Sequence, residues 1–256
     1  MTTASRGGFF GDRSSGHSAL SGYAAATLGS FGGFSLTTQV ARGFRDPVLS
    51  DRYFRGVTGR GFITGNPELS PETSIQLDTA LRYTGHGFRG AFYFYDYRFR
   101  DRIERYQDGP DRLFFRNRGA AYIRGIELEA QGEIATRLTL HLTFQHQRGE
   151  TREDRAPLDD LSPTTATMQL RKAMGERAFV QVRGAYYAAD DEAGPSEVKT
   201  PGYTLVDLSA GWPINRAIEL RVLGRNLLGA SYPVSPDSRA VLAPGISGLV
   251  TLLFRL

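Results

Sequence analysis

The residues of this sequence that could act in catalysis or bind a metal are scattered along the chain. The four histidines, His17, His86, His141 and His146, form no ligand-spaced group, and alternation places the last two on opposite sides of one segment. The chain has no cysteine, so thiolate metal sites and disulfides are excluded. No glycine-rich phosphate loop precedes a predicted helix. The sequence therefore predicts no enzyme, no metal site and no bound cofactor.

Charged side chains offer two further candidates. The acidic run from Asp190 to Glu192 could attract a cation, but such runs are more often solvated loops. The connection between residues 44 and 73 carries several side chains that could bind an anionic, aromatic ligand through charge and stacking. We predict this role for Arg45, Arg52, Tyr53, Arg55 and Arg60. The alternative is that Arg45 and Tyr53 stabilise the loop itself.

The elements that must position these residues are strands. Over segments of about ten residues the apolar and polar side chains alternate, which is the period of a β-strand. In 138–147, for example, Leu140 and Leu142 share one face and His141 and Thr143 the other. No segment shows a sustained helical period. The pattern predicts about eleven strands, over 18–28, 33–43, 73–84, 88–100, 115–131, 137–149, 164–173, 177–189, 202–213, 217–228 and 245–256.

The connections between these strands alternate in length. Short links are predicted at 29–32, 85–87, 132–136, 173–176 and 213–216, and long links at 44–73, 101–114, 150–163, 190–201 and 229–244. In an outer-membrane barrel, short turns lie at one end and long loops at the other. A β-sandwich gives no reason for this arrangement. The fold class predicted is all-β, an antiparallel up-and-down transmembrane β-barrel of about eleven strands.

The chemistry of the two faces agrees with a barrel. The polar faces carry full charges, such as Glu127, Glu129 and Arg183, which a packed sandwich core could not bury unpaired. A water-facing or plug-facing lumen tolerates such charges. We interpret the aromatic residues near the strand ends as girdles at the membrane interfaces, namely Phe92, Tyr93, Phe94, Tyr95, Tyr97, Tyr186, Tyr187 and Trp212. The alternative is a soluble sheet with one solvated face.

Composition excludes several other classes. Mean hydropathy is −0.32, and no apolar run approaches the roughly 20 residues of a spanning helix, so a helical transporter is excluded. The net charge is +4, and all basic residues except Lys172 and Lys199 are arginines. These arginines are dispersed among Asp and Glu, which argues against nucleic-acid binding. Residues 1–13 contain no apolar segment of the kind found in a secretory signal.

Seven short motifs follow one another in an order that resembles a known family. They are Ala41-Arg-Gly-Phe-Arg-Asp-Pro-Val-Leu-Ser-Asp-Arg-Tyr53, Asn66-Pro-Glu-Leu-Ser-Pro-Glu72, Asn117 with Ile123-Arg-Gly-Ile-Glu-Leu-Glu129, Pro157-Leu-Asp-Asp-Leu-Ser-Pro163, Tyr203-Thr-Leu-Val-Asp-Leu208, Asn226-Leu-Leu228 with Tyr232, and Pro244-Gly245. In this order and spacing they resemble the C-terminal half of the barrel of TonB-dependent outer-membrane receptors. Asp46 departs from the Ala usual at that place, and Leu256 from the usual terminal aromatic residue.

The resemblance implies a function in transport. The chain would be a segment of an outer-membrane receptor for the energised uptake of ferric siderophores or a similarly scarce nutrient. Outer-membrane lipid, the ligand and the TonB coupling protein are the implied partners. The absence of a histidine between Phe44 and Pro71 argues against haem. Alternatives are a truncated fragment that does not transport, or a small self-contained porin or adhesin.

The length predicts how the chain is divided. A barrel of this family has about 22 strands around a plug, so 256 residues correspond to about half a barrel. We predict an irregular segment over 1–17 and a partial barrel over 18–256. Nothing in the sequence resembles the plug, through which the family contacts TonB. Two unpaired edge strands are therefore expected.

Overall fold

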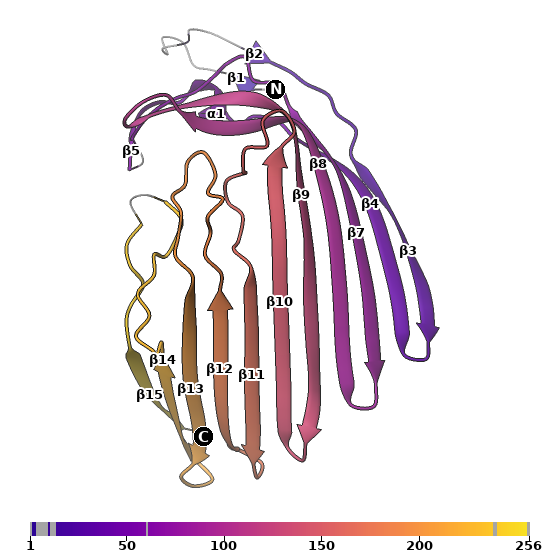
Figure 1. Cartoon of the computed structure of the whole chain (residues 1–256), viewed down its shortest axis with the longest axis vertical. Helices are drawn as coiled ribbons and strands as arrows, with labels where there is room; N and C mark the ends of the chain where they lie inside the picture. The colour runs from indigo at the N-terminus through magenta and orange to yellow at the C-terminus, as the bar shows by residue number, and fades with distance from the viewer. Residues whose placement is uncertain (1, 4–9, 11–13, 60, 238–239, 255–256) are drawn as a thin grey trace.

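The computed structural model of the chain describes residues 2–3, 10, 14–59, 61–237 and 240–254. Eleven strands form one continuous antiparallel sheet. Each of them pairs with the neighbouring strands that come before and after it among these eleven. Figure 1 shows the sheet as an open, curved wall of long strands. The strands are β3 (Gly22–Phe31), β4 (Phe34–Arg45), β7 (Glu72–Gly85), β8 (Phe88–Gln107), β9 (Arg112–Ala135), β10 (Leu138–Thr151), β11 (Thr165–Met174), β12 (Ala178–Tyr187), β13 (Tyr203–Pro213), β14 (Ile218–Arg225) and β15 (Ser247–Phe254).

The predicted antiparallel, up-and-down partial barrel is confirmed. The eleven predicted strands correspond one to one with these eleven. Strands β3 and β15 lie at the two ends of the path, and each pairs with one neighbour within the described residues. Every backbone group on their outer edges thus lacks a ladder partner there, as expected for a sheet that does not close on itself. The predicted end of the last strand, residues 255–256, lies outside the described residues.

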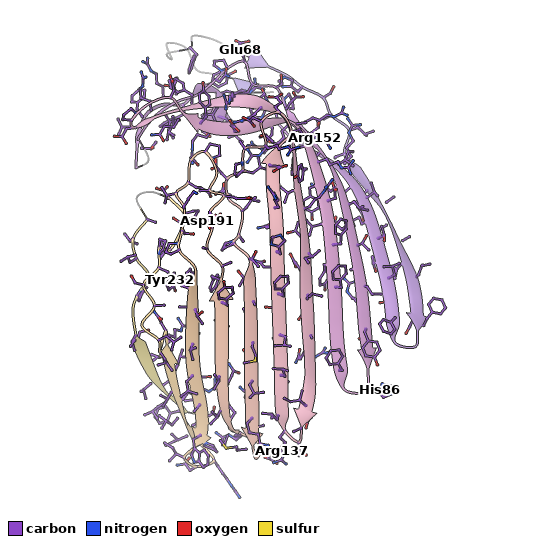
Figure 2. The ribbon with its side chains drawn as sticks, in the orientation of Figure 1. Glu68, His86, Arg137, Arg152, Asp191 and Tyr232 are labelled. Carbon is purple, nitrogen blue, oxygen red and sulfur yellow. The ribbon has the colours of Figure 1, made fainter. Side chains whose placement is uncertain are left out.

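The connections follow the predicted alternation, with one correction. The short turns lie at one end of the sheet, where Figure 2 labels His86 and Arg137, and the long connections lie at the other, where it labels Glu68, Arg152 and Asp191. The long loop predicted over 101–114 is wrong. There β8 and β9 continue as a paired hairpin from Arg102↔Arg118 to Gln107↔Leu113. The apolar–polar alternation weakens in this segment, but pairing between the strands satisfies the backbone groups.

The loop between β4 and β7 contains structure of its own. It begins with one helical turn, α1 (Leu49–Tyr53), and continues as a small hairpin of β5 (Arg55–Thr58) and β6 (Gly61–Thr64). This helix was not predicted from the sequence, because five residues are too few to show a helical period. Strand β6 also pairs in parallel with the start of β9. No helix in the described part of the chain has the length and apolar character needed to cross a membrane.

The N-terminal segment contributes one small element. Strands β1 (Thr2–Thr3) and β2 (Ser14–Ser15) pair with each other in an antiparallel sheet of two strands. They lie within the segment 1–17 for which irregular structure was predicted. The rest of that prediction falls largely on residues outside those described.

Register separates the two faces of the sheet. Directly paired residues share a face, and one such row runs across five strands through Leu36, Leu81, Phe92, Leu128 and Phe144. Four of these five side chains are exposed to solvent in the isolated chain. A second row continues the apolar surface through β12 to β15 as Val180, Ala210, Val222 and Val250. We refer to this surface as the apolar face.

The opposite surface, which we call the polar face, carries charged and hydroxyl side chains behind these apolar rows. There Arg183 contacts Asp207 at 3.5 Å, and the Thr143 and Thr167 hydroxyls are 2.6 Å apart. The two faces of the sheet therefore suit two different environments, one apolar and one polar.

The structure corrects part of the aromatic-girdle interpretation. Tyr95 and Tyr97 lie on the polar face, where the Tyr95 hydroxyl donates to Gln147 at 3.0 Å and the Tyr97 hydroxyl to Asp78 at 2.7 Å. Tyr93, two residues before Tyr95 on the same strand, shares this face. Tyr187 also lies there and stacks on a tyrosine of the next strand. A phenol needs a hydrogen-bond partner or water, and the polar face supplies both.

The remaining aromatic residues keep the predicted orientation. Tyr186 and Trp212 are well exposed on the apolar face. Phe92 and Phe94 share that face by register.

Candidate ligand-binding surface

The loop of residues 46–71 is held by Arg52, which is only 1% exposed. Its guanidinium donates to the Pro67 carbonyl oxygen at 3.1 Å and lies 3.6 Å from the carboxylate of Asp46. His17 contacts both groups, at 3.4 Å from Arg52 and 3.1 Å from Asp46. Helix α1 presents Arg52 to this interior, and Gly65 allows the returning chain to pass directly over the backbone of Arg52. Arg52 thus connects the beginning and end of the loop.

Arg45, at the C-terminal end of β4, also anchors the loop through several contacts. Its guanidinium contacts Asp51 at 3.3 Å and Glu72 at 3.7 Å, and it donates to the Ile103 carbonyl oxygen at 3.3 Å. These partners lie on α1, β7 and β8. The Arg45 side chain nevertheless stays half exposed. It could therefore accept a ligand contact in addition to its structural ones.

The other predicted ligand residues lie further out on the loop. Arg55 is exposed at the start of β5, and its guanidinium lies 5.7 Å from the ring centroid of Phe62. Tyr53 is half-buried, with its ring 6.4 Å from that of Phe10. Arg60 lies outside the described residues. The structure therefore brings Arg45 and Arg52 into the loop's supporting contacts and leaves Arg55 on its surface.

Two asparagines join this loop to the β8–β9 hairpin. The Asn66 side chain donates to the Phe115 carbonyl oxygen at 3.0 Å. The Asn117 side chain accepts from the Ser70 N–H at 2.7 Å and donates to the carbonyl oxygens of Ser70 and Asp101 at 2.9 and 2.7 Å. The loop and the hairpin are therefore one connected surface at the end of the sheet that carries the long connections.

The hairpin also carries a cationic cluster that was not predicted from the sequence. Glu104 is buried and contacts Arg116 at 2.6 Å and Arg118 at 3.0 Å. Arg118 also pairs with Asp154, and the Arg116 guanidinium lies 4.4 Å above the ring of Tyr106. One carboxylate thus orients two arginines, of which Arg116 remains exposed. The alternating signs of residues 98–112 were the available signal, but they were interpreted only as evidence against nucleic-acid binding.

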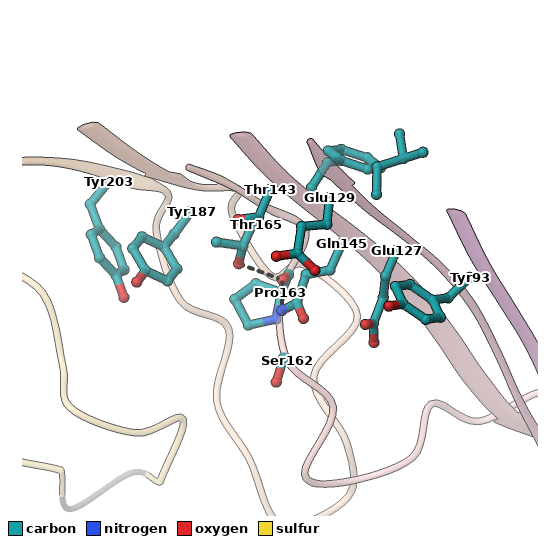
Figure 3. Close-up of a pocket in the computed structure, with 12 residues that line it drawn as sticks. Tyr93, Glu127, Glu129, Thr143, Gln145, Ser162, Pro163, Thr165, Tyr187 and Tyr203 are labelled. Carbon is teal, nitrogen blue, oxygen red and sulfur yellow. Dashed lines mark hydrogen bonds between the residues drawn. The ribbon is translucent and has the colours of Figure 1, made fainter. Parts of the chain in front are cut away.

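The polar face below this surface is hollowed. A cavity of about 420 Å³ is lined by residues of β8 to β13 and by the loop after β10 (Figure 3). Tyr187 and Tyr203 bound one side, stacked 4.5 Å apart, while Glu127 and Tyr93 bound the other. The loop is held against the face by Gln147, which donates to the Ser162 carbonyl oxygen at 3.3 Å. Aromatic rings beside carboxylates suit cationic or hydroxyl-rich groups.

A second hollow of about 620 Å³ shares Tyr93 and Glu127 with the first and extends toward β4. It is lined by both signs of charge, including Asp78 and Arg82. Within the described residues no group of three or more His, Asp or Glu side chains is arranged to hold a metal ion. The polar face therefore offers polar and aromatic contacts to a partner.

The chain matches a family model described as the β-barrel of TonB-dependent-like receptors, over residues 2–227. The chain belongs to this family. The predicted resemblance is thus confirmed, and the open sheet corresponds to a segment of a receptor barrel. The family is one of receptors and transporters and not a class of enzymes.

Individual relatives agree with this assignment. The chain is 24% identical over 227 residues to an iron-regulated outer membrane virulence protein of Vibrio cholerae, covering 78% of the chain and 35% of the relative. Among solved structures, the copper transporter OprC superposes with a TM-score of 0.79 at 19% identity, covering 91% of the chain and 39% of that protein. The siderophore receptor PirA of Pseudomonas aeruginosa gives 0.68 at 18% identity, with the same coverages.

The chain spans about a third of the length of the curated relatives it matches. At these identities the solved structures establish the fold alone.

Proposed function

We propose that this chain forms part of the wall and outer loops of an outer-membrane receptor that takes up ferric siderophores or a similarly scarce nutrient with energy supplied through TonB. The observation that carries the proposal is the register-continuous separation of apolar and polar faces in a sheet of this family. An apolar band toward lipid and a polar lumen are what such a receptor requires. The iron-regulated relative supports an iron-containing ligand.

In this proposal the domains have distinct tasks. Residues 18–256 supply lumen wall and outer loops, and the segment 1–17 precedes them. The TonB partner acts through a plug, and the hollows on the polar face contact that plug or the ligand. The loop residues Arg45, Tyr53, Arg55 and Arg60 contact an anionic ligand from the outer side. Arg52 positions the loop that carries them.

The absence of cysteine provides a direct test of membrane orientation. Val57→Cys lies on the loop of residues 46–71 and is 81% exposed, whereas Glu176→Cys is exposed at the short turn between β11 and β12. A membrane-impermeant maleimide added to intact cells should label the first variant alone, and both after the membrane is broken. Equal labelling of the two in intact cells would contradict the proposal.

Ligand identity requires a separate measurement. Cells that carry the intact gene, and matched cells in which it is deleted, should be compared for uptake of ferric siderophores, haem and cobalamin. We expect loss of ferric siderophore uptake upon deletion, because the outer loop is arginine-rich and lacks histidine between residues 44 and 71. Equal uptake with and without the gene would refute a transport role. Ion-conducting pores formed by this chain alone would favour the porin alternative.

A further inference from the structure

Four arginines surround a hollow of about 400 Å³ at the upper margin of the apolar face. They are Arg42 on β4, Arg98 and Arg100 on β8, and Arg152 just after β10. We call this cluster the arginine hollow. No Asp or Glu is among the described residues that line it. Such a group of like charges repels itself unless an anion lies among its members.

Register places the arginine hollow on the apolar face and not in the lumen. Arg42 pairs with Ile75, and Ile75 pairs with Arg98, so the three share one face. In the next row Arg100 pairs with Ala120, whose carbonyl oxygen accepts from the Arg152 N–H at 2.8 Å. Figure 2 labels Arg152 at the end of the sheet that carries the long connections.

Three of the four guanidiniums lack an internal counter-charge. Arg98 contacts Asp96 at 2.8 Å. For Arg42, Arg100 and Arg152, no carboxylate of the described residues lies within ion-pair distance, and all three are exposed. Elsewhere on this face the sequence does provide partners, since Arg124 contacts Asp96 at 2.6 Å and Arg148 contacts Glu150 at 3.4 Å. The hollow therefore gathers three guanidiniums that have no carboxylate partner among the described residues.

Below the hollow the surface is apolar on β4 and β7, whereas on β8, β9 and β10 it carries Asp96, Arg124 and Arg148. Ile75 lies within the same row as Arg42 and Arg98, and the next row toward the short turns begins with Val40 paired with Leu77. Ile75 and Val40 are both about half exposed. A molecule that fits this junction has an anionic head among the arginines and an apolar chain along the strands below. A free anion would use only the first part.

We propose that the arginine hollow binds the phosphate-bearing head group of a lipid in the outer leaflet, with its acyl chains along Val40, Ile75 and Leu77. This inference rests on the membrane orientation in the proposed function. Guanidinium groups bind phosphate through paired, charge-assisted hydrogen bonds, and the arginines around this hollow provide them from β4, β8 and the turn after β10. The site is distinct from the loop and lumen surfaces, because it lies on the opposite face of the sheet.

The test uses the full chain inserted in phosphatidylcholine vesicles that contain either bisphosphorylated lipid A or the same lipid without its phosphates. Lipid retained by the purified chain is measured by native mass spectrometry. We expect retention of the phosphorylated lipid. The triple variant Arg42→Gln, Arg100→Gln, Arg152→Gln should retain at least about tenfold less, since each arginine near a membrane surface contributes roughly a fivefold factor.

Matched controls decide whether position or total charge matters. Arg89→Gln, Arg216→Gln, Arg225→Gln removes the same charge from exposed sites outside the hollow and should retain the lipid as the native chain does. Replacing the three hollow arginines by lysine should restore most retention, which also shows that the fold is intact. Equal retention of both lipids by the native chain, or equal loss in the control variant, would overturn the proposal.

Two further outcomes separate this inference from its alternatives. Inorganic phosphate should compete only weakly, and full displacement of the lipid by phosphate would show an anion site instead of a lipid site. Correct maleimide labelling of Val57→Cys and Glu176→Cys combined with no lipid preference refutes this inference alone. Failure of the labelling experiment refutes the membrane orientation and this inference with it.

Discussion

The Arg52 guanidinium donates a hydrogen bond to the Pro67 carbonyl oxygen at 3.1 Å, across the whole 46–71 loop. The two residues are 15 positions apart in the sequence, and their hydrogen bond connects the beginning of the loop to its end. An arginine in an exposed-looking, polar loop would ordinarily be assigned to ligand binding. Its burial and its contact with Asp46 show that it organises the surface on which Arg55 is presented.

Replacing Arg52 by alanine should therefore loosen the loop and leave the sheet intact. The change leaves the Pro67 carbonyl oxygen without its Arg52 donor and Asp46 with His17 as its remaining contact, and losing a buried arginine of this kind costs about 3 kcal/mol. Limited proteolysis of the full chain should show faster cleavage within residues 46–71. The exposed Arg55→Ala provides the control, and its cleavage rate there should resemble that of the native chain. Unchanged cleavage in Arg52→Ala would contradict the supporting role.

Glu104 provides the second prediction, because it is the carboxylate that orients Arg116 and Arg118. Glu104→Ala leaves the largely buried Arg118 with Asp154 as its carboxylate partner, at a cost of about 3 kcal/mol. The lost energy should make this part of the hairpin open more often. Hydrogen exchange of the backbone amides between Arg102 and Arg118 should therefore be about a hundredfold faster. Below Arg100 exchange should be unchanged.

A matched carboxylate on the same hairpin gives the control. Asp108 contacts Arg112 at 3.9 Å, and both side chains are more than half exposed. Exposed pairs of this kind contribute little to stability. Asp108→Ala should therefore leave the exchange rates of the hairpin unchanged. Equal acceleration in the two variants would show that burial of Glu104 is not the decisive factor.

The fold was predictable because apolar and polar side chains alternate with a period of two over much of each long strand. Register follows once the turns are short, so the faces could be assigned from sequence for the aliphatic rows but not for the tyrosines of β8 and β12. Residues of the sequence motifs also make contacts that support the fold. The Asn117 side chain donates to the Ser70 carbonyl oxygen, and the Asn226 side chain donates to the Pro244 carbonyl oxygen at 3.3 Å. Those contacts join motifs far apart in the chain, which explains why the motifs occur together.

The candidate site was less predictable for a physical reason. Whether an arginine serves the loop or a ligand depends on which carboxylates and carbonyl groups surround it in space. Arg52 and Arg55 are three residues apart, yet one is buried and the other exposed. The arginine hollow was missed for the same reason, because Arg42, Arg100 and Arg152 meet only when β4, β8 and β10 are in register.

A close approach between two strands gives the third prediction. A Cβ atom on Gly125 would overlap the ring of Tyr95 and lie 2.9 Å from the His146 carbonyl oxygen. Gly125→Ala should displace Tyr95 from its hydrogen bond with Gln147 and lower stability by about 1–3 kcal/mol. Gly184→Ala is the control, since a Cβ there meets nothing within 4 Å. Denaturant unfolding of the chain in micelles measures both, and equal midpoints would contradict the crowding argument.

Glu197 links two of the long connections and makes that link depend on pH. Its carboxylate accepts from the Asp160 N–H at 2.8 Å and from the Gly194 N–H at 3.1 Å. Burial raises the pKa of Glu197 above its ordinary value, and the nearby charges of Asp159 and Asp160 raise it further, while the two N–H donors act in the opposite direction. The raised pKa means that folding of these loops favours the protonated form.

The link should therefore be strongest below the ordinary pKa of a glutamic acid and weaken as pH rises through the raised value. Hydrogen-exchange protection of the Asp160 and Gly194 amides, corrected for intrinsic exchange, should fall over that interval. In Glu197→Gln the protection should not depend on pH there, because the amide cannot ionise. Protection that increases with pH in the native chain would show that the N–H donors outweigh burial and the two aspartates.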